Sequence, residues 1–300
     1  MTQRVLEKLE QMNVIGLYNN GTSLNELEKI VHSDKRTIRD YLLANGVDVK
    51  GVKLPEVIPT KESIGLSKSE RKFNCKKFDV IDTEEKAYWL GFLYADGNVS
   101  SDLRKVELGL QACDVAHLHK FNRFMECEDN NVHYHPKITE SKVFDGYRWN
   151  MTSVHLCTIL NSYGCIPKKS LTLQFPDIKI FKEPSLIRHF IRGYWDGDGC
   201  LCFTYKTHGI DVLGTKEFLE VLKKYLPLET NILLHKNQTY MIKAFKRNAY
   251  KIANYLYKEA SIYLDRKYSK YLDFCRAYEE SYVELETQNG ELCDENTVLS

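Results

Sequence analysis

The apolar positions of the chain change their spacing along its length, and this change divides the chain into blocks. Over residues 14–47 they recur at helical intervals in three short stretches, which predicts three helices. Ser23 followed by Glu26 is typical of a capping box at the start of the second helix, and Asn45-Gly46 of the end of the third. The residues expected to face inward are Leu24, Leu27, Ile30, Ile38, Tyr41 and Leu42.

Residues 80–182 and 183–276 follow one pattern twice. In each block a helical segment is followed by two segments of strand-like alternation, a helix, two further strands and a last helix. Tandem copies of such a unit predict two halves related by an approximate two-fold axis. We therefore expect an α+β fold of two pseudo-symmetric αββαββα repeats, joined to a small all-α module within residues 1–50.

The segments outside these blocks are distinguished by their charge. Residues 51–79, with Pro55, Pro59 and many Lys and Arg residues, predict an extended basic linker. Residues 277–300 predict an acidic tail, because seven acidic residues and no Lys or Arg follow position 278. The formal net charge of the whole chain is +1, so without the seven negative charges after position 278 residues 1–278 carry a net charge of +8. That moderate excess permits a polyanionic partner.

The composition narrows the class of protein. A hydrophobic share of 43% is ample for a buried core, the N-terminal segment is too polar for a signal peptide, and no run approaches the roughly 18 apolar residues of a membrane span. Nine cysteines without a CxxC pair favour a reducing compartment, so we expect a soluble cytoplasmic protein. Cys113, His117, His119 and Cys127 could form a zinc site, although their spacing matches no familiar zinc finger.

Two apolar segments, residues 87–97 (AYWLGFLYADG) and 191–199 (IRGYWDGDG), end in the same way. Each carries two small residues four positions apart, which lets two helix backbones approach closely. These small residues are Gly91, Ala95, Gly193 and Gly197. If the two helices pack along them, Asp96 and Asp198 arrive together at the same end of the helix pair, each followed by the glycine preferred after a helix end.

Two carboxylates in this position are electrostatically unfavourable, because each faces the negative end of a helix dipole and repels the other. A divalent cation that prefers oxygen ligands removes both problems. The pattern therefore predicts a Mg²⁺ site, with Mn²⁺ as a substitute, at Asp96 and Asp198. In the alternative interpretation each aspartate only terminates a core helix, but two such motifs in register within a tandem repeat favour the metal site.

The third predicted helix of the N-terminal module begins with a cluster of polar and cationic residues. Two short helices with a tight junction are typical of a helix-turn-helix, whose second helix enters the major groove of DNA with its N-terminal residues leading. The candidate DNA contacts are Lys35, Arg36, Thr37 and Arg39. A small helical bundle with an ordinary charged face is the alternative interpretation.

The two motif segments resemble the paired motifs of the LAGLIDADG homing endonucleases in their single-chain, two-motif form. The matching positions are Gly91, Ala95, Asp96 and Gly97 in the first segment and Gly193, Asp196, Asp198 and Gly199 in the second. The resemblance covers about residues 80–275. It implies that the motif helices form the seam between the halves, that Asp96 and Asp198 bind the metal, and that Asp196 is structural. GCIPKKSLTL and YLDRKYSKY look like the segments that carry the family's basic residues, which implies catalytic roles for Lys169 and Lys267.

The function that this resemblance implies is site-specific DNA cleavage of the kind used in intron homing, with one phosphodiester hydrolysed on each strand. The strand faces would form a saddle in the major groove of a long, pseudo-symmetric or asymmetric double-stranded site. The protein would act as a monomer, encoded by a phage or associated with the nucleoid of a bacterial host. Candidate contacts on and beside the strands are Arg104, Lys105, Lys206 and Lys243.

Two other functions remain open for the same scaffold. One is a DNA-binding transcriptional regulator that has lost cleavage, and the other is an RNA-splicing maturase. The presence of Asp96, Asp198 and both lysines favours the endonuclease over the regulator. The predicted helix-turn-helix favours DNA over RNA as the partner.

Overall fold

A computed structural model describes residues 3–49, 70–139, 142–167, 169–204, 207–236 and 239–278. The chain divides into two compact units, Met1–Phe73 and Asn74–Ser300. Most of the predicted linker over 51–79 and of the predicted acidic tail over 277–300 lies outside the described residues. Among the described helices, none combines the length and the apolar character needed to cross a membrane.

The first unit is all-α. Its helices are α1 (Gln3–Gln11), α2 (Val14–Asn19), α3 (Leu24–Val31) and α4 (Lys35–Ala44). The capping box at the start of α3 is confirmed, because the Glu26 backbone N–H donates to the Ser23 hydroxyl and the Ser23 backbone N–H donates to the Glu26 carboxylate at 2.9 Å. Asp34 caps α4 by accepting from the backbone N–H of Thr37 at 3.0 Å. The sequence patterns do not indicate α1.

The core of this unit differs from the prediction at one position. Leu27, Ile38 and Leu42 are fully buried as expected, but Ile30 is 44% exposed. Val31 is buried in its place. The reason is geometric, because Val31, four positions after Leu27 and seven after Leu24, lies between these two residues on the helix face, whereas Ile30 lies at the edge of that face and turns toward solvent.

The second unit has an α+β fold and contains the two predicted repeats. The elements of the first repeat are α5 (Glu84–Asp96), β1 (Gly97–Val99), β2 (Lys105–Gln111), α6 (Val115–Phe124), β3 (Val132–Tyr134), β4 (Lys137–Ile138), β5 (Val143–Phe144), β6 (Gly146–Thr152) and α7 (Val154–Ser162). Those of the second are α8 (Leu186–Asp198), β7 (Gly199–Thr204), β8 (Thr207–Gly214), α9 (Lys216–Leu222), β9 (Ile232–Lys236), β10 (Thr239–Phe245) and α10 (Lys246–Tyr257), followed by a helix over 265–278. Short 3₁₀ turns of the second unit are η3 (Ala112–Asp114), η4 (Lys169–Leu171), η5 (Ile178–Ile180) and η6 (Lys223–Tyr225), whereas η2 (Glu70–Lys72) belongs to the first unit.

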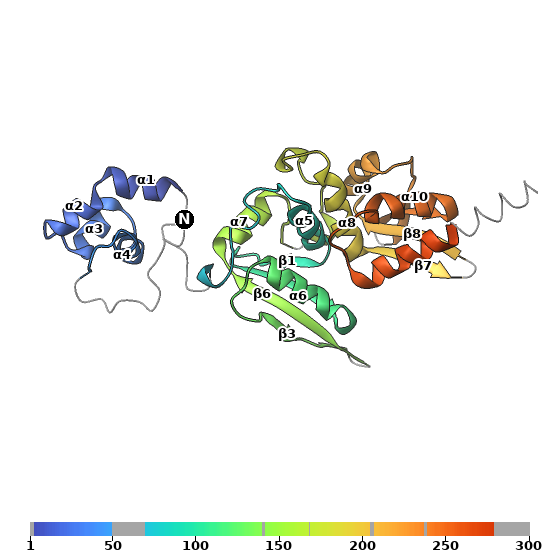
Figure 1. Ribbon diagram of the computed structural model, residues 1–300, viewed down its shortest axis with the longest axis horizontal. Coiled ribbons are helices and arrows are strands. Elements are labelled where there is room, and N and C mark those ends of the chain that lie inside the picture. Colours follow the sequence, from blue (N-terminus) through green and yellow to red (C-terminus); the bar gives the residue numbers. More distant parts are fainter. Residues whose placement is uncertain are drawn as a thin grey trace, which may run out of the picture. The chain divides into compact units, whose positions relative to one another are not determined.

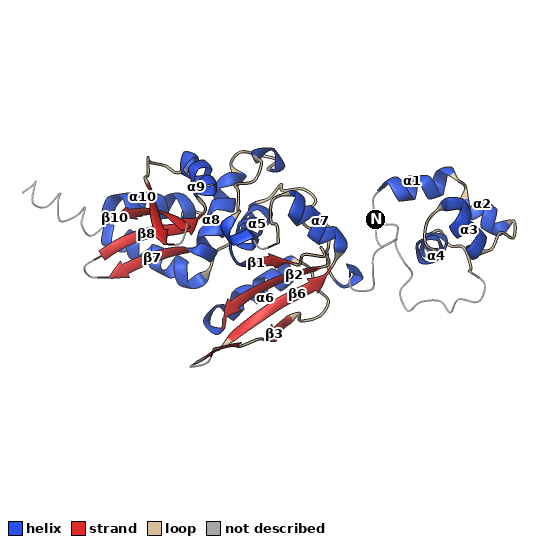
Figure 2. Cartoon of the chain, turned by 180° about the vertical axis from the view of Figure 1, so that it is seen from behind, coloured by secondary structure: helices blue, strands red, loops and turns tan. Residues whose placement is uncertain are grey.

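The two repeats build sheets of the same topology. The strand order is β1-β2-β6-β3 in the first sheet and β7-β8-β10-β9 in the second, and all neighbours are antiparallel. Figure 1 shows α6 along the first sheet and α10 along the second, and Figure 2 shows from behind that α5 and α8 lie between the sheets. The helix-facing side of each sheet is buried, as at Val106 and Trp149 in the first and Val212 and Ile242 in the second.

Helices α5 and α8 pack with their backbones in direct contact, which confirms the predicted seam. A Cβ atom added to Gly91 would lie 1.9 Å from the carbonyl oxygen of Phe190, and one added to Gly193 would lie 1.9 Å from the carbonyl oxygen of Tyr88. The same pairing continues toward the helix ends, where a Cβ on Gly197 would meet the Ala95 methyl at 2.2 Å. No side chain larger than hydrogen fits at the two central positions.

Substitution Gly193→Ala tests this seam. We expect it to lower the free energy of unfolding of the second unit by at least about 2 kcal/mol, because a methyl group meets backbone that cannot give way. The measurement is urea unfolding followed by tryptophan fluorescence, which reports on this unit alone because Trp89, Trp149 and Trp195 all lie in it. The matched control is Gly109→Ala, whose added Cβ would approach nothing nearer than the Tyr147 carbonyl at 3.9 Å. Equal effects of the two substitutions would contradict the seam.

Candidate active site

The paired helices deliver two acids to one end of the seam. Asp96 is the last residue of α5 and Asp198 the last residue of α8, and each leads directly into the first strand of its sheet. The glycines that follow are extended and not left-handed, with φ of −75° at Gly97 and −94° at Gly199. Glycine is required at these positions because a side chain would not fit, and not because the backbone is left-handed. A Cβ on Gly97 would meet the Leu93 carbonyl oxygen at 2.5 Å.

Both carboxylates are crowded by protein and still reach solvent. Asp96 and Asp198 are each exposed at the residue level, so the acids form an open surface and not a closed cavity. The pKa of Asp96 is raised to about 7, first because the surrounding protein removes water from the carboxylate and second because Asp198 repels its charge. Desolvation also raises the pKa of Asp198. Holding both acids ionised therefore costs free energy in the absence of a bound cation.

The predicted lysines lie at the same place. Lys267 is buried and its ammonium group donates to three carbonyl oxygens at the end of α8, those of Trp195 at 2.7 Å, Asp196 at 2.7 Å and Gly199 at 2.5 Å. Lys169, also buried, donates to the carbonyl oxygen of Gly97. Each lysine thus binds the glycine carbonyl that follows an acid. Cations are favoured at these negative helix ends, and both lysine charges lower the pKa of Asp96.

An ion pair beside Lys267 links the two repeats. The Arg266 Nε atom lies 2.9 Å from both carboxylate oxygens of Asp114, which is buried at the start of α6. Arg266 also lowers the pKa of Asp96, so its charge acts on the site. The sequence contains no signal for this pair, because its members are 152 positions apart.

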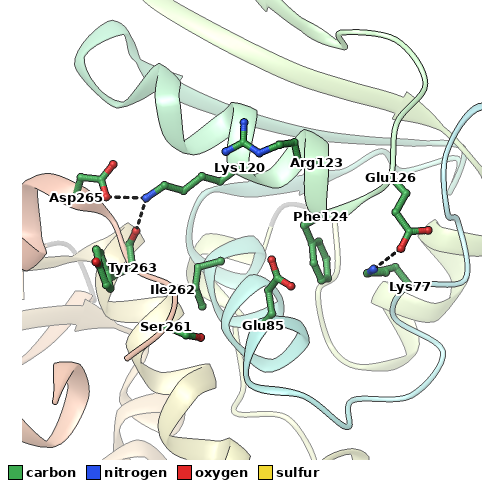
Figure 3. Close-up of a pocket in the computed structure, with 10 residues that line it drawn as sticks. All are labelled: Lys77, Glu85, Lys120, Arg123, Phe124, Glu126, Ser261, Ile262, Tyr263 and Asp265. Carbon is green, nitrogen blue, oxygen red and sulfur yellow. Dashed lines mark hydrogen bonds and ion pairs between the residues drawn. The ribbon is translucent and has the colours of Figure 1, made fainter. Parts of the chain in front are cut away.

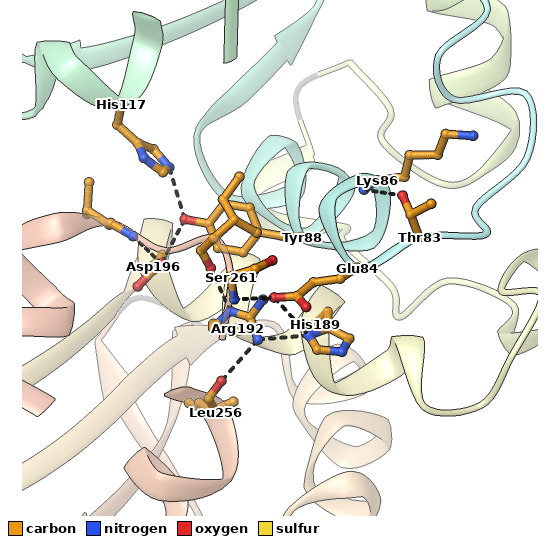
Figure 4. Close-up of polar contacts among 12 residues, drawn as sticks. Thr83, Glu84, Lys86, Tyr88, His117, His189, Arg192, Asp196, Leu256 and Ser261 are labelled. Carbon is orange, nitrogen blue, oxygen red and sulfur yellow. Dashed lines mark hydrogen bonds and ion pairs between the residues drawn. The ribbon is translucent and has the colours of Figure 1, made fainter. Parts of the chain in front are cut away.

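Asp196 has the structural role that the resemblance implied. Its buried carboxylate accepts a hydrogen bond from the Tyr88 hydroxyl at 2.7 Å (Figure 4). It also accepts hydrogen bonds from the Tyr257 hydroxyl at 2.5 Å and from the Leu264 backbone N–H at 2.7 Å. Because Tyr88 comes from α5 and the other two donors from the second repeat, this carboxylate ties the two motif helices together.

A second buried network crosses the seam near the start of α5. The guanidinium of Arg192 is fully buried and binds the Glu84 carboxylate at 2.7 Å, His189 Nδ1 at 2.8 Å and the carbonyl oxygen of Leu256 at 3.1 Å (Figure 4). It also donates to the carbonyl oxygen of Ile262 at 3.0 Å. Glu84 also accepts from the backbone N–H of Ser261 at 2.8 Å. A buried charge is tolerated only with such full pairing, so this network is structural.

The alternative zinc site is not supported by the structure. His117 is buried against Trp89 and Phe92, and its Nε2 atom lies 2.9 Å from the Tyr88 hydroxyl, whereas Cys113 is exposed. Within the described residues, no group of three or more His, Cys, Asp or Glu side chains is placed to hold a metal ion. The pair Asp96 and Asp198 supplies two carboxylates, and a cation there would complete its coordination with water and substrate oxygens.

The candidate DNA contacts of α4 fall into two groups. Lys35, Arg36 and Arg39 are at least partly exposed, and they pair with acids of their own unit, Lys35 with Glu28 at 3.8 Å and the two arginines with Asp40 at 4.0 and 2.7 Å. The prediction that Thr37 contacts DNA is wrong. This residue is only 4% exposed, and its hydroxyl donates to the carboxylate of the capping residue Asp34 at 2.6 Å. Its hydroxyl therefore serves the helix cap and does not face a partner.

The candidate contacts of the second unit lie on or near the sheets. Arg104 and Lys243 are exposed, and Lys105 lies 2.7 Å from Glu107 on the same strand. Lys206 lies outside the described residues. The structure therefore brings Asp96, Asp198, Lys169 and Lys267 together, and it places Lys105 and Lys243 on strands β2 and β10 of the two sheets.

A separate cleft of about 550 Å³ lies between α6 and residues 261–265 (Figure 3). Two of its lysines are paired with acids at 2.6 Å, Lys77 with Glu126 and Lys120 with Asp265. None of the four predicted catalytic residues lines it. The paired acids Asp96 and Asp198 therefore lie outside this cleft.

Fold and site define a two-repeat α+β protein whose motif helices present a pair of acids between two sheets. Solved structures similar to this chain are LAGLIDADG homing endonucleases. I-AabMI bound to uncleaved DNA has 13% identity and a TM-score of 0.42 over 66% of this chain and 91% of its own. I-SmaMI bound to cleaved DNA has 10% identity and a TM-score of 0.43 over 68% and 90%. I-WcaI bound to its recognition sequence has 11% identity and a TM-score of 0.45 over 70% and 93%.

Sequence comparison adds no relative. No protein-family model matches the chain, and no curated protein matches it.

The buried His117 makes the seam sensitive to acid. Burial lowers its pKa to about 3, so the folded protein keeps this imidazole neutral while the unfolded chain protonates it below about pH 6.5. The unfolded state then binds more protons, and stability falls as the pH falls. We expect native protein to lose about 2 kcal/mol of unfolding free energy through this group between pH 7 and pH 5.

Urea unfolding at the two pH values measures this loss. In His117→Gln the unfolding free energies at pH 7 and pH 5 should differ by about 2 kcal/mol less than in the native protein, whatever the effect of the substitution at pH 7. His133→Gln, at an exposed strand position, is the matched control and should leave the difference unchanged. An unaltered difference in the His117 variant would show that this histidine is not kept neutral by burial.

Proposed function

We propose that this chain is a site-specific DNA endonuclease of the homing type, which requires a divalent metal and cuts both strands of its target. The observation that carries the proposal is the pairing of Asp96 with Asp198 at the ends of two helices in backbone contact. Each acid is open to solvent, has a buried lysine on the next carbonyl, and stands where a sheet begins.

The pseudo-symmetry of this arrangement supports a duplex as the substrate. The two strands of double-stranded DNA run in opposite directions and are related locally by two-fold axes. Two equivalent acids related by the approximate two-fold of the repeats can therefore meet equivalent phosphates, one on each strand. A single-stranded substrate would give no reason for a second copy of the acid and its lysine.

The donor set at the helix ends fits a hard cation. Asp96 and Asp198 would hold Mg²⁺, or Mn²⁺ in its place, because both carboxylates reach solvent and are near enough for the charge of Asp198 to raise the pKa of Asp96. When bound, such an ion supplies positive charge that polarises the phosphodiester and makes water a better nucleophile. A site built on two carboxylates leaves room for water and phosphate oxygens.

The lysines act on the acids in this proposal. Lys169 and Lys267 hold the glycine carbonyls that follow the acids, so they fix the backbone directly after each carboxylate. Their charges favour the ionised carboxylates that a cation needs, and they add positive potential where negative charge develops on the phosphate. Each half then hydrolyses one phosphodiester, in which water adds across the bond and leaves one phosphate end and one hydroxyl end.

The N-terminal unit is proposed as a second DNA-binding module. Its α3 and α4 meet at a tight turn, with His32 in the left-handed conformation between them, and α4 begins with Lys35 and Arg36 exposed. This arrangement fits a helix whose start enters the major groove. Two linked modules bind a longer site more tightly than either does alone.

Cleavage of DNA tests the catalytic proposal. The full chain is incubated with a library of randomised duplexes and with genomic DNA, with Mg²⁺ or with EDTA, and new ends are sequenced. We expect discrete double-strand breaks that require metal. Asp96→Asn and Asp198→Asn should each reduce the cleavage rate at least about a hundredfold, because each removes a charged ligand from the centre of charge development.

The matched control is Glu220→Gln, which neutralises a partly exposed acid on α9 that pairs with Lys223. It should cut like the native chain. Tight binding to a selected duplex without metal-dependent cutting would replace the proposal with a DNA-binding regulator.

The role of the module is tested by binding. Lys35→Ala combined with Arg36→Ala should weaken affinity for the selected duplex, and should lower the slope of log affinity against log salt by about one for each phosphate that the variant no longer neutralises. The positions of cleavage should stay the same, since the acids are unchanged. Lys29→Ala, an exposed lysine of α3, is the control. Unchanged affinity and slope in the double variant would exclude this face of α4 as a DNA-binding surface.

A further inference from the structure

The outer face of each sheet is the side that alternates with the buried residues. In the first sheet this face is polar from strand to strand. Its cross-strand rows are Asn98, Glu107 and Asn150, then Lys105 and Thr152, then Gly109, Arg148 and His133. Such side chains offer hydrogen-bond donors and acceptors, which are the groups that read base edges directly.

The outer face of the second sheet has a different character. Two of its rows are apolar, and these are Cys202, Gly209 and Phe245, and then Leu213, Met241 and Leu233. A row between them, Cys200, Asp211 and Lys243, carries the charges. The pseudo-symmetry of the topology is therefore not matched by the chemistry of the two faces.

The apolar rows are open on the described part of the chain. Phe245 is 50% exposed and Leu233 is 49% exposed. The Phe245 ring lies over Gly209, where an added Cβ would meet it at 3.3 Å, and the Lys243 ammonium lies 4.9 Å from the ring centre. The opposite side of these strands, at Val212, packs on the helices. An exposed apolar surface rimmed by charge is typical of a binding surface.

This face is continuous with the paired acids. Strand β7 leaves α8 at Asp198, so Cys200 on the outer face is two residues from the acid, and Asn98 has the same relation to Asp96. A duplex with one phosphate at each acid must extend in both directions from them. It therefore runs along the outer face of both sheets.

We propose that the two repeats read their half-sites by different chemistry, the first by hydrogen bonds to base edges and the second by apolar contacts to thymine methyl groups. This inference rests on the proposed function and adds a property of its substrate. The thymine C5-methyl is the apolar group that the major groove presents, and side chains such as Phe245 and Met241 can bury it. The half-site bound by the second repeat is accordingly thymine-rich where it faces these two rows.

The test uses a duplex selected by the full chain from a randomised library in EDTA. All thymines of one half-site are replaced by deoxyuridine, which removes only the methyl groups, and affinity is measured by fluorescence anisotropy. In one half-site the removal of each buried methyl group should weaken binding about fourfold, the effect of burying one such group. The same replacement in the other half-site should change affinity less than twofold.

Variants assign the sensitive half-site to the second sheet. In the double variant Met241→Ala and Phe245→Ala the deoxyuridine effect should disappear, whereas Asn150→Ala on the first sheet should leave it intact. Tryptophan fluorescence checks that each variant is folded. Equal effects in both half-sites, or none in either, on a duplex that is bound and cut would overturn this inference and leave the endonuclease standing.

Two further outcomes separate the inference from the function beneath it. If no duplex is selected and none is cut, the proposed function fails and this inference fails with it. If the native chain dimerises without DNA and the double variant is a monomer, the apolar face is an interface between copies, and the thymine contact is overturned.

Discussion

The backbone contact between α5 and α8 positions everything else at the site. Side chains normally hold two helices 8–10 Å apart, but Gly91 and Gly193 let carbonyl groups of one helix lie against the other. Since both helices end at an aspartate, the depth of this contact determines how near the two acids come. Asp196 and Arg192 then cross the seam with buried hydrogen bonds, so the helices are fixed in register as well as in distance.

This proximity has an electrostatic cost that the surrounding residues reduce only in part. Burial and mutual repulsion raise the pKa of Asp96 to about 7, even though Lys169, Lys267 and Arg266 all act in the opposite direction. The lysines are engaged with backbone carbonyls and so cannot neutralise the carboxylates by direct contact. A stable fold alone gives no reason to gather these charges, and their cost is the one that the cation of the proposed function would relieve.

The parts of the site that were predictable from the sequence are those encoded locally. The spacing of small residues located the seam, and the repeat placed Asp96 and Asp198 at one end of it. Arg192 with Glu84, and Arg266 with Asp114, could not be predicted, because each pair joins residues more than 100 positions apart and neither partner has a distinctive local pattern. The prediction that Thr37 contacts DNA failed for a local reason, because the Thr37 hydroxyl donates to the Asp34 carboxylate that caps the helix.

In the second unit the helix seam is symmetric, whereas the outer faces of the two sheets differ, and this contrast has a physical origin. At the seam each helix is the environment of the other, so a change in Gly91 or Gly193 disturbs both halves at once, and the small residues must correspond. The outer faces of the sheets share no such contact. A substitution of Phe245 or Asn150 alters one half alone and leaves the acids in place. Chemical asymmetry can therefore accumulate on the faces while the centre stays paired, which allows a protein built from two similar repeats to bind a site whose halves differ.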